Sequence, residues 1–271
     1  MTDASVEETP LRRQWGLVAL TFLAALVGGG GAIAAVAGEA LAARWAVGAA
    51  GVAGFELWFL YRHLGRNRDD DHEGLYRSLG GANGLTLLRG VGVAGVAGFA
   101  LVPPRAAFAW VPALLYGGAA ALDRLDGYAA RATGRTTVLG EKLDMAVDTL
   151  GFLVAPLVGV LWGRLPVWYL SLSLARYLFR AGRGLRRRRG RPVYGLPPSR
   201  VRRPLAGVQM AFIAVALAPV LPAGTVRVAA AVVLVPSLAV FARDYLAVVG
   251  VVGPKRDRAA DTTDPTGDPG D

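Results

Sequence analysis

The sequence predicts an all-α fold, a polytopic membrane helix bundle with about eight transmembrane helices. Three observations support this fold class. Hydrophobic residues make up 54% of the 271 residues, and the mean hydropathy of +0.41 is high for a soluble domain. Apolar runs long enough to cross a bilayer recur along the chain. Basic residues gather in every second connection between these runs.

A membrane-spanning helix requires about 20 mostly apolar residues. Runs near that length follow one another along most of the chain. The predicted spans are 15–37, 43–61, 85–103, 106–122, 145–163, 165–181, 205–222 and 224–250. The first of them is longer than the apolar region of a signal peptide and follows a tail that contains acidic residues. It is therefore predicted to be a retained helix.

The basic residues predict the orientation of the bundle. Arginine and lysine occur in the N-terminal tail, in the connections at 62–82, 123–144 and 180–203, and after the last span. With eight spans, all of these segments lie on one side of the membrane, whereas the alternate connections are short and nearly uncharged. The positive-inside rule then predicts that both termini are cytoplasmic. The protein is expected in the plasma membrane, with segment 123–148 at its cytoplasmic face.

The charge and the lack of cysteine narrow the function classes. Basic cytoplasmic loops and contacts with lipid headgroups are enough to explain the net charge of +10. No motif in the sequence predicts a nucleic-acid partner. Cysteine is absent, and His63 and His72 lie outside the apolar segments. A metal bound by this chain is therefore expected to be a hard cation with oxygen ligands.

Four aspartates mark the connection between the fourth and fifth predicted spans. They are Asp123, Asp126, Asp144 and Asp148. Residues three or four positions apart share one face of a helix, so each pair is expected to project together. If the two helices are neighbours, four carboxylates converge and repel one another unless a cation intervenes. The set suits Mg²⁺, Mn²⁺ or Ca²⁺. The alternative is that these are solvated charges paired with nearby arginines and lysine.

The aspartates belong to a longer pattern. It reads Asp123-x-x-Asp126-Gly127-x-x-Ala130-Arg131, then eight residues, then Gly140-x-x-x-Asp144-x-x-x-Asp148. This pattern resembles the signature of the CDP-alcohol phosphatidyltransferase family, and the resemblance extends over 83–250, including "NGLTLLR" at 83–89. It implies three regions: an extension at 1–82 with two transmembrane helices and a cytoplasmic linker, a six-helix enzyme domain at 83–250, and a disordered acidic tail at 251–271.

The resemblance also implies the chemistry of the site. The expected enzyme transfers a phosphatidyl-type group from a CDP-activated lipid to an alcohol and releases CMP, and it acts in phospholipid biosynthesis as a homodimer. Asp123, Asp126, Asp144 and Asp148 are the implied ligands of two Mg²⁺ or Mn²⁺ ions. Asp148 is also the implied catalytic base. Gly127, Ala130, Arg131 and Gly140 are the implied contacts of the CDP-lipid.

The acceptor alcohol is predicted from the second half of the chain. Arg176 lies four residues before Arg180, and a charged residue at membrane depth is a functional candidate. Relatives with phosphorylated acceptors carry Ser-x-x-Gly-Lys-x-x-Thr-x-x-Gln. Ser199, Arg203 and Gln209 fit this segment, whereas Arg202 replaces its glycine and Ala206 its threonine. We therefore expect Arg176, Ser199 and Arg203 to bind the acceptor.

Several alternatives stay open on the sequence. The basic residues favour a phosphorylated polyol, such as glycerol phosphate or inositol phosphate, over serine or another non-phosphorylated alcohol. The lipid can be diacyl or ether-linked. A divalent-cation transporter also uses carboxylates, but its site is expected in broken helices at the middle of the membrane.

Overall fold

The computed structural model describes residues 4–69, 74–133, 137–196 and 198–252, and the side chains of these residues apart from 4–9 and 125–133. The described residues form helices and connecting segments and contain no strand, which confirms the all-α prediction. The predicted tail at 251–271 lies outside the described residues except for its first two positions.

Eight α-helices and four short 3₁₀ helices make up the described chain. The α-helices are α1 (Ala4–Ala37), α2 (Glu39–His63), α3 (Gly80–Gly98), α4 (Val111–Thr133), α5 (Val138–Leu161), α6 (Ser171–Arg188), α7 (Arg202–Leu217) and α8 (Ala223–Val248). The 3₁₀ helices are η1 (Leu64–Arg66), η2 (Phe99–Leu101), η3 (Ala106–Phe108) and η4 (Val167–Leu170). Each predicted span overlaps one of the eight α-helices.

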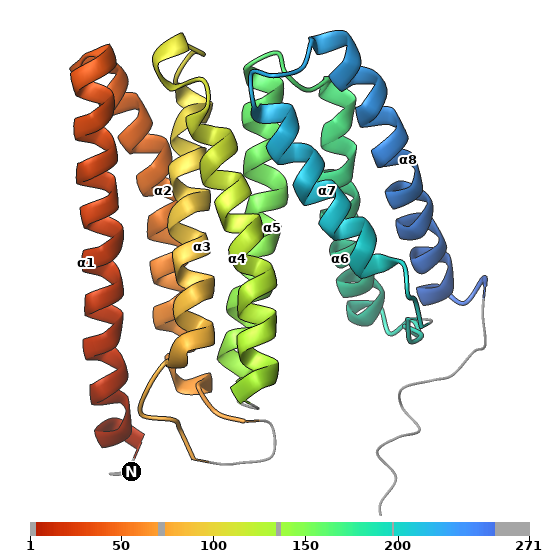
Figure 1. Ribbon diagram of the computed structural model, residues 1–271. Coiled ribbons are helices and arrows are strands. Elements are labelled where there is room, and N and C mark those ends of the chain that lie inside the picture. Colours follow the sequence, from red (N-terminus) through yellow and green to blue (C-terminus); the bar gives the residue numbers. More distant parts are fainter. Residues whose placement is uncertain (1–3, 70–73, 134–136, 197, 253–271) are drawn as a thin grey trace, which may run out of the picture.

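The long helices run side by side, with α1 and α2 at one edge of the bundle and α6 and α8 at the other (Figure 1). The hairpin of α1 and α2 packs on α3, and α3 packs on both α4 and α5. The C-terminal ends of α2 and α4 lie at the same end of the bundle as the N-terminal end of α1 (Figure 1). We call this the aspartate end, because the connection after α4 joins the two helices that carry the predicted metal ligands.

Helix α3 is the central element of the N-terminal half. Every residue from Val93 to Phe99 is buried. Small residues allow this close packing, since a Cβ atom at Gly92 would lie 3.2 Å from the carbonyl oxygen of Leu115 on α4. On the opposite side, a Cβ atom at Gly48 of α2 would lie 2.9 Å from the carbonyl oxygen of Ala97. The extension is thus packed tightly against the family-like domain through α3.

Five of the described helical segments are long and apolar enough to cross a membrane. They are Pro10–Ala37, Gly80–Leu101, Ala106–Arg124, Val138–Leu161 and Ala223–Val248. The other three predicted spans fall on helices with specific departures: α2 contains Glu56, α6 ends in three arginines, and α7 has 16 residues, about 24 Å of helix. The count of eight spans and the cytoplasmic termini remain predictions.

Candidate metal and substrate site

A buried arginine on α3 lies among three of the four predicted metal ligands. The Arg89 side chain is 3% exposed, and its guanidinium nitrogens approach carboxylate oxygens of Asp123 at 2.7 Å, Asp144 at 2.6 Å and Asp148 at 2.5 Å. Asp123 comes from α4, whereas Asp144 and Asp148 come from α5. The convergence predicted from their spacing is therefore present for these three residues.

The start of α5 is fixed by a side-chain cap. Thr137 has an extended backbone, and its hydroxyl oxygen accepts a hydrogen bond from the Gly140 N–H at 3.0 Å. This satisfies one of the backbone donors that a helix leaves unpaired at its N-terminus. Asp144 and Asp148 follow one turn apart on the same helix face, which directs both carboxylates toward Arg89.

The three carboxylates fit the requirements of a divalent cation. One oxygen from each of Asp123, Asp144 and Asp148 lies within 4.8 Å of the other two, and all three residues are half-buried. Their three negative charges and the single positive charge of Arg89 leave two negative charges, which one divalent cation would balance. Carboxylate oxygens are also the ligands that Mg²⁺ and Mn²⁺ prefer. Such an ion would supply positive charge to neutralise a bound pyrophosphate.

Four other predicted site residues lie on the last turns of α4. The side chains of Asp126, Gly127, Ala130 and Arg131 lie outside the described residues. Their backbone continues the helix past the predicted span end at 122, so that Asp123 and the segment after it belong to one uninterrupted helix. The predicted roles of these four residues stay expectations from the motif.

Gly140, a predicted CDP-lipid contact, lies against a buried asparagine of α3. Asn83 is 4% exposed and donates from Nδ2 to the carbonyl oxygen of Leu79 at 2.7 Å and to the Thr137 hydroxyl at 3.4 Å. A Cβ atom at Gly140 would lie 2.5 Å from Oδ1 of Asn83. The glycine therefore allows the start of α5 to approach α3 closely, in addition to any contact with substrate.

We expect Gly140→Ala to destabilise the protein by about 1–3 kcal/mol, the usual cost of forcing extra volume into a packed site. The added methyl group must displace Asn83, whose hydrogen bonds hold the start of α5. The matched control is Gly84→Ala, since a Cβ atom there meets nothing within 4 Å. Thermal unfolding in detergent measures both variants. Equal midpoints for the two would show that the close approach at Gly140 has no energetic weight.

A second polar region adjoins the aspartates between α5, α6, α7 and α8. A cavity of about 260 Å³, which we call the arginine cavity, is lined by Arg176, Arg180 and Arg202 together with Asp244, two uncharged polar residues and apolar side chains. Phe152 lines it one helical turn after Asp148, so the cavity lies next to the carboxylate cluster. The four-residue spacing of Arg176 and Arg180 correctly predicted that both share one face.

The guanidinium groups in this cavity differ in their pairing. Arg202 Nε donates to Asp244 Oδ2 at 2.6 Å, and this hydrogen bond raises the pKa of the Arg202 guanidinium. The Arg176 guanidinium carbon lies 3.8 Å from the centre of the Phe152 ring, while its Nε is buried without a hydrogen-bond partner among the described residues. A buried donor without a partner is uncommon in native proteins and is a feature of sites that take a polar ligand.

Two predicted acceptor residues are placed outside the lining of the arginine cavity. Arg203 is exposed, and Ser199 is half-buried in the segment before α7. Arg202, the residue that departs from the family segment, lines the cavity instead. Gln209, which fits that segment, also lines the cavity, donates to Ser237 Oγ at 2.8 Å and accepts a hydrogen bond from the Tyr169 hydroxyl.

Sequence reasoning did not place Arg89 in the site, although a signal was present. Asn83, Thr86 and Arg89 recur every three residues within "NGLTLLR", and all three are buried in α3. Polar residues spaced along one face of an otherwise apolar helix indicate a polar contact inside the bundle. The contact partners could not be assigned from this segment, because Asp144 and Asp148 lie 55 and 59 residues further along the chain.

The several long apolar helices indicate that the protein is a multi-pass membrane protein. Its helices also build a polar site, a carboxylate cluster that could hold a metal ion. The family model of the CDP-alcohol phosphatidyltransferases matches residues 80–242, more than half of the chain, and the protein belongs to this family. Searches of curated proteins and of solved structures found no significant match. The resemblance predicted from the aspartate pattern is confirmed.

Membership of this family implies phosphatidyl transfer from a CDP-alcohol to an alcohol, and the family is in general dependent on divalent metal. This favours an enzyme over the cation transporter that the carboxylates alone left open. The aspartates also lie on continuous helices rather than on the broken helices expected of a transporter site.

Proposed function

We propose that this protein transfers the phosphatidyl-type group of a CDP-activated lipid to a phosphorylated polyol, such as glycerol phosphate or inositol phosphate. The observation that carries the acceptor class is the buried, unpartnered Nε of Arg176 in a cavity that two further arginines line. Three guanidinium charges against the one carboxylate of Asp244 leave an excess of two positive charges. Such a cavity favours an anionic ligand over serine, whose ammonium group would be repelled.

The carboxylate cluster supports the donor half of the reaction. Asp123, Asp144 and Asp148 would hold the divalent cation, expected as two Mg²⁺ or Mn²⁺ ions when Asp126 also contributes. The cation and Arg131 would neutralise the CDP pyrophosphate. Asp148 lies one turn from Phe152, at the border of the arginine cavity. We propose that Asp148 is the base that accepts the proton of the acceptor hydroxyl. Gly127, Ala130 and Gly140 are the proposed remaining contacts of the CDP-lipid.

Three further expectations accompany this proposal. We propose a homodimer on the strength of the family resemblance. We propose the plasma membrane as the location and the cytoplasmic face as the side of the active site, because the basic connections lie at the aspartate end. Diacyl and ether-linked lipids are both compatible with the site.

We expect Arg176→Ala to raise the KM for a phosphorylated acceptor roughly ten- to a hundredfold, the usual cost of losing a charge-assisted hydrogen bond. Arg176→Lys should raise the same KM by less, because lysine keeps the positive charge but lacks the planar fork of the guanidinium group. The KM for the CDP-lipid should change little. A two-substrate titration of CMP release measures both constants. Arg187→Ala, an exposed arginine of the same helix outside the cavity lining, is the control.

The same titration separates the two candidate residues at the start of α7. Arg203 matches the family segment by position, whereas Arg202 lines the arginine cavity. A larger effect of Arg202→Ala than of Arg203→Ala would assign the acceptor contact to the cavity. Serine supporting CMP release as well as a phosphorylated polyol would refute the acceptor class and leave the aspartate chemistry untouched.

A further inference from the structure

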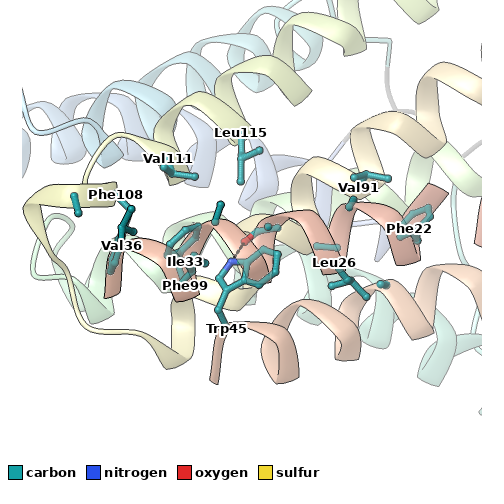
Figure 2. A pocket seen from close by; sticks show the side chains of 17 residues that line it. Phe22, Leu26, Ile33, Val36, Trp45, Val91, Phe99, Phe108, Val111 and Leu115 are labelled. Carbon is teal, nitrogen blue, oxygen red and sulfur yellow. Dashed lines mark hydrogen bonds between the residues drawn. The ribbon is translucent and has the colours of Figure 1, made fainter. Parts of the chain in front are cut away.

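The α1–α2 hairpin, which lies outside the family match, encloses a second cavity against α3, η2, η3 and α4. We call it the α1 cavity; its volume is about 320 Å³. Figure 2 shows its lining arranged lengthwise, from Phe22 and Val91 at one end to Val36 and Phe108 at the other. The α1 positions that line it run from Phe22 to Val36 on one helix face, a distance of about 21 Å.

The α1 cavity offers no polar side chain to a ligand. Its lining consists of aliphatic and aromatic residues, alanine and glycine, and the one polar side-chain atom among them is Nε1 of Trp45. That N–H donates to the carbonyl oxygen of Gly95 at 3.0 Å, so it is already satisfied. An apolar cavity of about 150 Å³ stays dry and binds small hydrocarbons, and the α1 cavity is about twice that size.

The Trp45 side chain of α2 lies between α1 and α3 at the edge of the cavity. A Cβ atom at Gly29 of α1 would lie 2.5 Å from the Trp45 ring, and Gly98 of α3 contacts the same ring from the other side. Two glycines therefore admit one indole between α1 and α3. Figure 2 shows this ring among the side chains that line the cavity.

The mouth of the α1 cavity lies at the end of the bundle away from the aspartates. Its exposed lining residues include Ala32 and Val36 near the C-terminal end of α1 and Ala107 in η3, and Val36 is 58% exposed. At the opposite end of the cavity, Phe22 is buried. Most of the lining belongs to segments apolar enough to span a membrane, so in a bilayer this mouth would open toward lipid chains.

We propose that the α1 cavity binds one hydrocarbon chain of a bilayer phospholipid, which enters from the leaflet away from the aspartates. The CDP-lipid is a poorer occupant, because its headgroup must reach the aspartate end. The α3 residues that line the α1 cavity (Val91, Ala94 and Gly95) also differ from those beside Asp148 (Arg89 and Val93). A bound chain fills the space between the extension and α3, so the extension and the lipid together form one packed layer against the family domain.

Photolabelling tests this proposal on the full-length protein in liposomes. The probe is a phosphatidylglycerol with a diazirine on one acyl chain, and labelled residues are located by peptide mass spectrometry. Leu23 and Val27 on the exposed face of α1 should be labelled by the surrounding bilayer, and they serve as the reference. Ala94 and Phe99 are buried, so their labelling requires a chain inside the α1 cavity. Labelling of Leu23 and Val27 alone would overturn the proposal.

A matched pair of variants tests whether the label at Ala94 depends on the cavity. Ala25→Phe fills the space, whereas Ala24→Phe adds the same ring to an exposed neighbour outside the lining. Ala25→Phe should lower the labelling of Ala94 roughly tenfold relative to Leu23, as expected when about two methylene groups are excluded. Ala24→Phe should leave it unchanged. If Ala25→Phe fails to fold, Ala32→Phe blocks the exposed mouth, with Ala35→Phe as its control. Unchanged labelling in a folded cavity variant would contradict the proposal.

A competition arm separates a bilayer lipid from the substrate. An excess of unlabelled CDP-lipid should leave the labelling of Ala94 unchanged, because the two lipids use different sites. Suppression of the label by CDP-lipid would overturn the assignment to a bilayer lipid. The proposal does not rest on the acceptor class, since none of these labels depends on turnover.

Discussion

Asp144→Asn should lower the rate of CMP release at least about a hundredfold, because a charge that would hold the metal beside the transferring group is lost. The amide keeps the shape of the side chain but removes one of the three negative charges that would hold a divalent cation. Asp123→Asn should have an effect of the same order, because its carboxylate completes the cluster from α4. The measurement is CMP release from CDP-lipid at saturating Mg²⁺ and acceptor.

The stability of these variants separates a catalytic role from a structural one. Removing one of the three carboxylates relieves their mutual repulsion and still leaves Arg89 with two partners. The unfolding midpoint should therefore stay close to that of the wild type although activity is lost. Glu141→Gln is the matched control, since Glu141 is an exposed acid on the same helix one turn before Asp144. If the rate of CMP release by Asp144→Asn is within twofold of the wild-type rate, Asp144 has no role in the reaction.

Arg89→Leu should destabilise the protein by about 3–5 kcal/mol, the usual cost of breaking a buried ion pair by removing one partner. Three carboxylates would then face one another without a compensating charge. Arg89→Lys should recover part of this loss, because the ammonium group keeps the charge but cannot match the fork that contacts all three acids. Thermal unfolding in detergent is the measurement, and Arg105→Leu, at an exposed arginine before η3, is the control.

A divalent cation provides a specific check on this interpretation. Mg²⁺ should raise the unfolding midpoint of Arg89→Leu more than that of the wild type, since the ion replaces the lost positive charge beside the carboxylates. If Mg²⁺ raises neither midpoint, the carboxylates do not hold the ion, and if it raises both equally, Arg89 does not compete with the ion for them. An unchanged midpoint of Arg89→Leu without metal would show that the ion pairs carry no net stability.

The sequence predicted the helices and the convergence of Asp123, Asp144 and Asp148, because both leave strong local signals. Apolar runs define the helices, and a four-residue spacing places Asp144 and Asp148 on one face of α5 whatever the rest of the fold. The meeting of Asp123 with this pair required that α4 and α5 be neighbours, which a short connection between two helices favours.

Other parts of the site depend on packing that no local pattern encodes. Adjacent helix positions point about 100° apart, so whether Arg202 or Arg203 lines the arginine cavity depends on where α7 begins and how it is rotated. Arg89 reaches the aspartates only because α3 lies between α2 and the pair α4–α5. Glu56, within a predicted span, is buried in the structure against Gly90 of α3. The α1 cavity is likewise lined by residues of several helices, among them Trp45 of α2, and their meeting is not encoded in the hydropathy of any one segment.

The central proposal is that the carboxylate cluster holds a divalent cation for transfer from a CDP-lipid. The most direct test is CMP release by the purified enzyme with CDP-lipid and glycerol phosphate or inositol phosphate, first in excess chelator and then with Mg²⁺ or Mn²⁺ restored. Without the ion the three carboxylates repel the pyrophosphate, so release should fall to background in chelator and return in full with the metal. Full CMP release in excess chelator would contradict the account.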